Sequence, residues 1–225
     1  DPNLQNIPVK TELGKKIRDA FVAQKGFELV SLDYSQIELR IAALLSQDEF
    51  LTQVFADGKD VHSAVAMKVF GVSEGDVTQE MRRRAKVINF GILYGMGVNA
   101  LKDALGTDRK EAQIFYDNYF EQFPKIEGYL DGVIEEVKNN GYTTTLFGRR
   151  RYFPGIRSPL PFIKAMAERM AINAPIQGTS ADLIKIAILR VDEYLAKHKL
   201  QNSVRLGLQV HDELVFEVKK DVEQK

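Results

Sequence analysis

The amino-acid sequence predicts an α+β fold, in which β-strands near both ends of the chain flank a long helical insertion. Short apolar segments with β-forming residues occur at 27–33 and 204–219, and most of the sequence between them repeats apolar residues at helical spacing. The 225 residues are 44% hydrophobic and 28% charged, so the chain is long and apolar enough to build a sizeable core.

The first elements follow a turn-rich start at 1–8. An amphipathic stretch at 14–22 comes next, and the strand at 27–33 ends on an acid, Asp33. Ser35, with Glu38 three residues on, has the spacing of a capping box and predicts a helix that opens at Ser35 and runs to about residue 45. Further helical patterns cover about 49–57, 61–70, 78–94, 98–105, 108–122 and 125–139.

The second half predicts a strand, two helices and a hairpin. Gly141 ends the preceding helix, and the residues at 142–147, rich in Thr and aromatic side chains, favour a strand followed by a basic turn at 148–152. Two separate helices are expected at 160–173 and 177–198. The hairpin at 204–219 follows, and no repeat, low-complexity tract or linker is visible.

Alternating apolar residues predict the register of this hairpin. Val210 would pair with Leu214, and the pairs further from the turn would follow with the same spacing: Leu208 with Phe216 and Leu206 with Val218. This register implies a three-residue loop, His211-Asp212-Glu213, with Asp212 at its apex. Acids at turn tips commonly have no function. An acid between His and Glu that closes two apolar strands is nevertheless a good mount for a metal-binding carboxylate.

Composition excludes several classes of protein. Lys+Arg and Asp+Glu are both 31, so any nucleic-acid surface must come from local clustering of charge. The absence of Cys excludes disulfides and thiolate metal sites and fits a reducing compartment. No apolar run approaches the roughly 18 residues of a membrane span. The chain begins without Met or a signal-peptide pattern and looks like part of a longer protein.

The segment 81–95 combines cations and aromatic rings on one helical face. Arg82, Lys86, Phe90 and Tyr94 are four residues apart, so each step turns only about 40° around the helix axis. Like charges at this spacing destabilise a helix by a few tenths of a kcal/mol, which an anionic ligand would offset. A nucleoside triphosphate fits this order of groups. A solvated basic helix with an aromatic core stripe remains the alternative.

Two acids are candidates for a metal site. Asp33 ends the first strand and Asp212 lies in the hairpin loop, 179 positions later (212 − 33). If the fold brings them together, they form a hard oxygen site suited to Mg²⁺. Two such ions would activate an attacking oxygen and stabilise a leaving oxygen in phosphoryl transfer.

Three segments resemble, in order, motifs A, B and C of the family A DNA polymerases, which are related to bacterial DNA polymerase I. They are 33–40 (DYSQIELR), 82–95 and 209–213 (QVHDE), and the segments 1–8 and 173–179 also resemble parts of the family. The resemblance covers essentially the whole chain. It implies a polymerase palm of antiparallel strands and helices, at 1–60 and 141–225, with helical fingers at 61–140. A thumb and an exonuclease-like domain before residue 1, and a short palm segment after Lys225, would lie outside this chain, so proofreading and 5′-nuclease activities cannot be assigned to it.

The resemblance implies template-directed DNA synthesis, in which a primer 3′-OH attacks a deoxynucleoside triphosphate and pyrophosphate leaves. Asp33, Asp212 and the main-chain carbonyl of Tyr34 would hold two Mg²⁺ ions, for which Mn²⁺ could substitute. Glu213 would lie nearby without being an essential ligand. The implied partners are primer-template DNA and deoxynucleoside triphosphates, without a membrane. The protein would act as a monomer in the bacterial cytoplasm, at the nucleoid.

The resemblance also assigns the nucleotide-binding residues. Arg82 and Lys86 would contact the triphosphate, and Lys86 would donate a proton to the departing pyrophosphate. Phe90 would pack on the sugar and base; because it lacks a hydroxyl that could replace a missing 3′-OH, poor acceptance of dideoxynucleotides is expected. Glu38 would act as a steric gate against a 2′-OH. The remaining nucleotide contacts would be Tyr94 in the base pocket, His62 near the phosphates, and Tyr34 and Gln36.

DNA would be bound by a separate set of residues. Arg169, Asn173 and Gln177 have the i, i+4, i+8 spacing of one helical face, which suits minor-groove acceptors common to all correct base pairs. His211 would touch the primer terminus. The backbone phosphates would be contacted by Arg149, Arg150 and Arg151. The resemblance adds Gln5 and Asn6 to the DNA contacts.

Three other functions remain open. A phage-type RNA polymerase shares the palm, but Glu38 and Phe90 favour deoxynucleotides. A metal phosphohydrolase built on His211 and Asp212 would need further His ligands, and the only others are His62 and His198. A catalytically silent DNA- or nucleotide-binding fragment that needs the missing flanks is the third alternative, and metal-dependent nucleotide incorporation distinguishes it from a polymerase.

Overall fold

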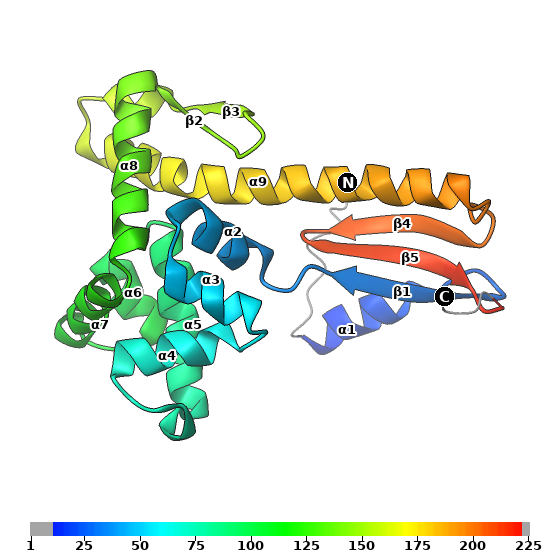
Figure 1. Ribbon diagram of the computed structural model, residues 1–225, viewed down its shortest axis with the longest axis horizontal. Coiled ribbons are helices and arrows are strands. Elements are labelled where there is room, and N and C mark those ends of the chain that lie inside the picture. The colour runs from blue at the N-terminus through cyan, green and yellow to red at the C-terminus, as the bar shows by residue number, and fades with distance from the viewer. Residues whose placement is uncertain (1–10, 222–225) are drawn as a thin grey trace. The chain divides into compact units, whose positions relative to one another are not determined.

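A computed structural model describes residues 11–221, which form two compact units. The first unit combines the chain up to Ile37 with the chain from Ala181 onward, and the second is Glu38–Ser180. The predicted α+β class is confirmed, whereas the division at residues 60 and 140 stays a prediction. The elements (Figure 1) are α1 Glu12–Asp19, β1 Phe27–Asp33, α2 Ile37–Ser46, α3 Glu49–Ala56, α4 Val61–Phe70, η2 Glu74–Asp76, α5 Gln79–Leu93, α6 Val98–Leu105, α7 Arg109–Gln122, α8 Pro124–Asn140, β2 Tyr142–Thr144, β3 Arg150–Tyr152, η3 Pro154–Arg157, α9 Pro161–Lys197, β4 Val204–Val210 and β5 Glu213–Lys219.

The first unit contains a three-stranded antiparallel sheet in the order β1-β5-β4 (Figure 1). The predicted bounds of β1 are confirmed. The predicted hairpin register is wrong, because Val210 pairs with Glu213 and the loop has only two residues, His211 and Asp212. The register then shifts between Leu206 and Leu208, at a β-bulge. Strict alternation of apolar residues cannot reveal such a bulge, which inserts one extra residue in one strand.

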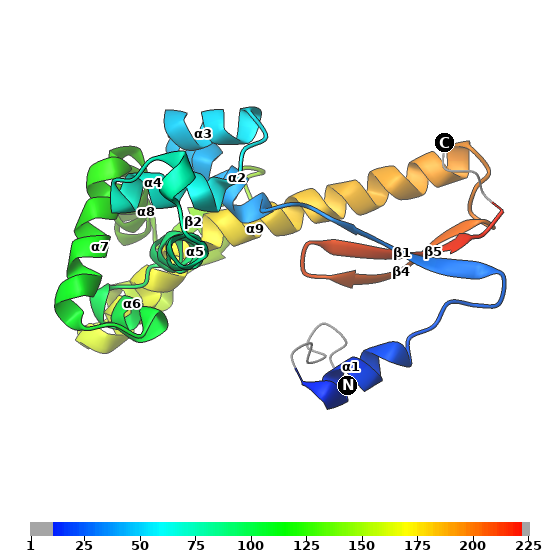
Figure 2. The ribbon, with the colours of Figure 1, turned by 90° about the horizontal axis from the view of Figure 1, so that it is seen from below.

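The second unit is mainly helical, and α3, α4, α5 and α7 each begin at an acid or a threonine that caps the helix. The side chains of Asp48, Asp60, Thr78 and Asp108 each accept a hydrogen bond from a backbone N–H in the first turn of α3, α4, α5 and α7. Figure 2 shows α4 next to α5, and these two helices are in contact. Caps of this kind satisfy backbone donors that a helix leaves unpaired.

The start of α2 differs from the prediction. Gln36 has a φ of 55°, outside the helical region, and the helix begins at Ile37. The proposed helix start at Ser35 is therefore wrong. The predicted stop at Gly141 is confirmed, since this residue ends α8 with a φ of 79°.

Two predictions for the second half are also wrong. The expected strand at 142–147 ends at Thr144 and pairs with β3, which falls in the segment expected to be a basic turn. The two helices expected on either side of residue 175 are one continuous helix, α9, with Pro175 inside it. Ala171, Ala174 and Ile176 are buried around this proline. Their burial favours an unbroken helix over the local preference of proline to end one.

None of the helices in the described part of the chain is both long and apolar enough to cross a membrane.

Candidate active site

The first unit brings the two candidate metal ligands together. Asp33, at the end of β1, pairs across the sheet with Glu213, the first residue of β5. The backbone N–H of Tyr34 donates to the carbonyl of Asp212 at 3.3 Å. Antiparallel pairing of β1 with β5 therefore closes the gap of 179 positions between the two aspartates. We call Asp33, Asp212 and Glu213 the carboxylate site.

Like charges gather at the carboxylate site. Desolvation raises the pKa of Asp33 above its ordinary value, and the negative charges of Asp212 and Glu213 raise it further. Ser31 donates its hydroxyl to a carboxylate oxygen of Glu213. Glu213 thus has a hydrogen-bond donor of its own, and its expected place beside the site without being an essential ligand stays a prediction.

The donors at this site fit a hard divalent cation. Carboxylates and backbone carbonyls are the oxygen ligands of Mg²⁺, and a cation would relieve the repulsion that raises the pKa of Asp33. Among residues 11–221, no group of three or more His, Asp and Glu side chains is arranged to hold an ion. The predicted ligand set of two aspartates and the Tyr34 carbonyl stays a prediction.

The other predicted residues of the first unit lie on exposed turns. His211 opens the β4–β5 loop with a left-handed φ of 54°, and its carbonyl accepts from the Gln209 amide at 3.1 Å. The Tyr34 side chain is 45% exposed, and Gln36 follows two residues later. The side chains of Tyr34 and His211 are therefore accessible to a ligand, and Gln36 is partly buried.

The predicted basic and aromatic helix is confirmed as α5, whose side chains at 82, 86, 90 and 94 we call the α5 face. The rings of Phe90 and Tyr94 are 5.9 Å apart, and the ring of His62 on α4 is 5.8 Å from Phe90. Tyr94 donates its hydroxyl to Glu38. Glu38, the proposed steric gate, is thus hydrogen-bonded by Tyr94, the side chain proposed to line the base pocket.

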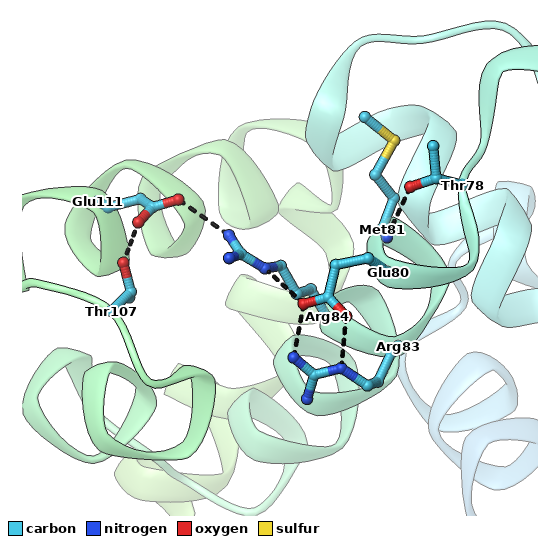
Figure 3. Close-up of polar contacts among 7 residues, drawn as sticks. All are labelled: Thr78, Glu80, Met81, Arg83, Arg84, Thr107 and Glu111. Atoms are coloured by element: carbon cyan, nitrogen blue, oxygen red, sulfur yellow. Dashed lines mark hydrogen bonds and ion pairs between the residues drawn. The ribbon is translucent and has the colours of Figure 1, made fainter.

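Carboxylates bind two arginines of α5 that are not on the α5 face (Figure 3). Arg83 donates two hydrogen bonds to Glu80, at 2.6 and 2.7 Å. Arg84 bridges Glu80, at 3.0 Å, and Glu111 of α7, at 2.9 Å, and Glu111 also accepts from Thr107. Hydrogen bonds from Arg83 and Arg84 lower the pKa of Glu80 to about 2. These two arginines are therefore paired with acids of the helical unit itself.

Arg82, on the α5 face, is bound by an acid that we did not predict. Its Nε and Nη2 donate to the two carboxylate oxygens of Asp60, at 2.7 and 3.0 Å. Burial would raise the pKa of Asp60, but hydrogen bonds from Arg82 and Ser63 hold it well below its ordinary value. The position of Asp60 immediately before a helical pattern was the available signal, since Asp is a preferred N-cap.

Lys86 differs from the arginines, because it is exposed and forms no ion pair with any residue that the structure describes. His62, close by, is buried, and its Nδ1 has no hydrogen-bond partner within residues 11–221. Desolvation lowers the pKa of His62, and the cations of Lys86 and Arg82 lower it further against the opposing charge of Asp60. His62 is therefore neutral at pH 7, and Lys86 is the cation of the α5 face that has no ion-pair partner in the described chain.

The predicted DNA contacts of α9 lie on one continuous helix. Arg169 approaches α5 so closely that a Cβ on Gly95, which has a φ of 73°, would lie 3.2 Å from the Arg169 Cα. Tyr94 and Arg169 line a pocket of about 660 Å³. Gln177 lines another, of about 210 Å³, and Asn173 Oδ1 is buried without a hydrogen-bond partner in the described chain.

The three arginines of the basic β2–β3 hairpin contact other residues of the second unit. Arg149 donates from Nη2 to the Gly178 carbonyl of α9 at 3.0 Å. The guanidinium groups of Arg150 and Arg151 lie over the rings of Tyr142 and Phe153, at 4.6 and 5.3 Å. Their proposed phosphate contacts stay predictions, and Gln5 and Asn6 lie outside the described residues.

Comparisons with known proteins agree with this architecture. The model of the family "DNA polymerase family A" matches residues 1–225. The thermostable DNA polymerase I of Thermus filiformis is 51% identical over 221 residues, and the DNA polymerase I of Pseudomonas aeruginosa is 49% identical over 222. These alignments cover 98% and 99% of this chain but 26% and 24% of the relatives, so the chain spans about a quarter of their length.

A solved structure is also similar to this chain. It is the POL domain of Pol1 from M. smegmatis in complex with DNA primer-template and dNTP, with a TM-score of 0.92 and 45% identity. The similarity covers 98% of this chain and 39% of that one. With motifs A, B and C in order and the family model matching from end to end, this chain belongs to DNA polymerase family A.

Proposed function

We propose that this chain carries the catalytic and nucleotide-selecting part of a DNA-directed DNA polymerase. The observation that carries the proposal is the meeting of Asp33 and Asp212 at the turn-facing end of the sheet, where no cation of the described chain forms an ion pair with either carboxylate. Phosphoryl transfer requires such a site, because charge builds up on both the attacking and the leaving oxygen.

Asp33 and Asp212, with the Tyr34 carbonyl, would hold two Mg²⁺ ions. Bound there, the metals would supply Lewis-acid activation of the attacking 3′-oxygen and stabilise the charge on the leaving oxygen. Mn²⁺, which accepts the same oxygen ligands, would substitute. Glu213, held by Ser31, keeps negative potential at the site without being required as a ligand.

The α5 face would bind the incoming deoxynucleoside triphosphate. Lys86 and Arg82 contact the phosphates, and Lys86, as a cation without an ion-pair partner in the described chain, is the group able to donate a proton to pyrophosphate. Phe90 packs on the sugar and base beside Tyr94 and His62. Glu38, hydrogen-bonded by Tyr94, excludes a ribose 2′-OH.

Primer-template DNA is the proposed second substrate, with minor-groove contacts from Arg169, Asn173 and Gln177 and a primer contact from His211. Two observations support it: the three α9 residues share one helix, and the related POL domain is described in complex with primer-template DNA and dNTP. We further propose a monomer that acts on DNA at the bacterial nucleoid, in the cytoplasm.

The test is extension of a primed DNA template with Mg²⁺ and one correct deoxynucleotide. The parent chain should add one nucleotide, Asp212→Asn should lose activity by at least about a hundredfold, and Asp192→Asn, an exposed acid of the same unit, should match the parent. Circular dichroism checks that each variant is folded. No incorporation by a folded parent chain would refute the proposal and leave a silent nucleotide- or DNA-binding fragment.

A further inference from the structure

Asp60 is held in place by more hydrogen bonds than a helix cap requires. As the N-cap of α4 it accepts from the Ser63 N–H at 3.0 Å and from the Ser63 hydroxyl at 2.6 Å. It also accepts two hydrogen bonds from Arg82 on the neighbouring helix α5. The carboxylate is therefore fixed by its own helix, and the guanidinium is fixed by the carboxylate.

The geometry of this ion pair leaves one edge of Arg82 available. Asp60 takes Nε and one Nη2 hydrogen, and no residue within the described chain accepts a hydrogen bond from Nη1. The Arg82 side chain is 40% exposed and that of Asp60 is 34% exposed. A planar guanidinium with one edge bound and no acceptor within the described chain on the other is pre-organised for a phosphate.

The two pairs that involve the adjacent arginines have a different character. Arg83 binds Glu80, three residues away on the same helix, and both side chains are more than half exposed. Arg84 is tied to Glu111 of α7. Neither arginine belongs to the α5 face. Among the three, only the pair of Arg82 and Asp60 fixes a residue proposed to touch the nucleotide.

We propose that Asp60 is the positioning residue for triphosphate binding: it orients the guanidinium of Arg82 so that the Nη1 edge meets a phosphate of the incoming nucleotide. This inference rests on the proposed function of the α5 face. Asp60 does not touch the nucleotide and acts only through Arg82.

Charge and orientation predict opposite effects when Asp60 is neutralised. Removing a negative charge close to Arg82, Lys86 and a bound triphosphate would, by electrostatics alone, strengthen phosphate binding. Loss of orientation would weaken it, because the amide keeps only one acceptor oxygen and Arg82 would lose the two-point, charge-assisted contact that fixes its plane. Asn at position 60 still caps α4, since Asn and Asp are equivalent N-caps, so the helix start is preserved.

The experiment is calorimetric titration with dTTP and Mg²⁺ of the parent chain, Asp60→Asn, Arg82→Ala and the double variant, with Glu111→Gln as the control for loss of an ion pair on α5. Asp60→Asn should bind dTTP about tenfold more weakly, the effect commonly seen when a supporting hydrogen-bond partner of a binding group is lost. In the Arg82→Ala background the same change should not weaken binding further, because only the orienting effect depends on Arg82. In primer extension, KM for dTTP should rise more than kcat falls.

The outcomes separate this inference from the function on which it rests. Unchanged or tighter binding of dTTP by Asp60→Asn, with a parent chain that binds, would overturn the positioning role alone. Additive losses in the double variant would do the same, because Asp60 would then act independently of Arg82. A folded parent chain that binds no dTTP would overturn both proposals.

Discussion

The carboxylate site and the α5 face handle charge in opposite ways. At the carboxylate site, Asp33 lies with two further acids, and their repulsion raises its pKa. On α5, acids from the same or neighbouring helices bind all three consecutive arginines, and Lys86 is the cation without an ion-pair partner in the described chain. Acids thus neutralise most of the positive charge on α5, whereas the acids of the carboxylate site lie next to one another.

This difference indicates where a ligand of opposite charge is needed. Ion pairs with good geometry satisfy charges that serve structure, whereas like charges brought together by the backbone make a site that is stabilised only when a counter-charge binds. The carboxylate site lacks a cation, and the α5 face lacks an anion at one lysine. A divalent metal and a triphosphate are matching ligands for these two sites.

The sharpest test of the comparison is the contrast between Lys86 and Arg83. Lys86→Ala should reduce nucleotide incorporation by about a hundredfold or more, since an unpaired cation aimed at the developing phosphate charge would be lost. Arg83→Ala removes the same charge from the same helix but from a pair with Glu80, and should stay within about twofold of the parent. Single-nucleotide primer extension measures both. Equal losses would mean that total charge, rather than the unpaired lysine, decides activity.

Sugar selection tests whether recognition belongs to the α5 face and not to the carboxylate site. Phe90→Tyr would add a hydroxyl able to replace a missing 3′-OH, and should improve incorporation of dideoxynucleotides relative to deoxynucleotides by about tenfold, the value of one hydrogen bond. The dependence of the rate on Mg²⁺ concentration should not change. Competition between ddTTP and dTTP in primer extension gives the ratio, and an unchanged ratio would contradict the placement of Phe90 on the sugar.

The acids of the two regions should respond to pH with opposite signs. The pKa of Asp60 is lowered, so its stabilisation is present above the ordinary carboxyl pKa of about 4 and is lost as pH falls. Asp60→Asn should therefore cost about 1 kcal/mol of unfolding free energy at pH 7, a value reduced for partial exposure, and progressively less below pH 4.

The pKa of Asp33 is raised, so its ionised form costs stability above that pKa and the cost disappears as pH falls. Asp33→Asn should stabilise the metal-free protein at pH 7 by a few tenths of a kcal/mol, since the group is mostly exposed, and should give no gain near pH 3. Urea unfolding between pH 3 and pH 7 measures both variants. Effects of the same sign would contradict the charge arrangement described above.

The smallest effect is expected for Glu111→Gln. This change removes the ion pair between α7 and Arg84, whose partner Glu80 remains (Figure 3). The free energy of unfolding should fall by less than about 1 kcal/mol, and primer extension should match that of the parent. A marked loss of activity would show that the structural ion pairs of α5 also serve the chemistry.

Most elements were predictable from local patterns, because caps and strand-forming residues act over short distances. The helix at 61–70 and the strand at 27–33 have the predicted bounds. Errors arose where tertiary structure prevailed over local preference. Burial of the side chains around Pro175 favours one long helix. Alternation of apolar residues predicts the register of a hairpin only when neither strand contains a bulge, and here a bulge beside Gly207 shifts the register.

The candidate site was predictable in a different way. Spacing placed Lys86 and Phe90 on one helical face, but it could not bring Asp33 and Asp212 together, because that contact depends on strand pairing across the chain. The resemblance to the family supplied this pairing. Asp60 was missed because its partner, Arg82, lies 22 positions away on another helix.

The bulge beside Gly207 divides the hairpin into two segments whose pairing registers differ by one residue. On the side of the turn, Val210 opposite Glu213 fixes the position of Asp212; beyond the bulge, Leu206 meets Phe216 and Val204 meets Val218 in a register shifted by one. Because the two registers differ by one residue, the pairing on the side of the turn, rather than the pairing of the far segment, determines where Asp212 lies.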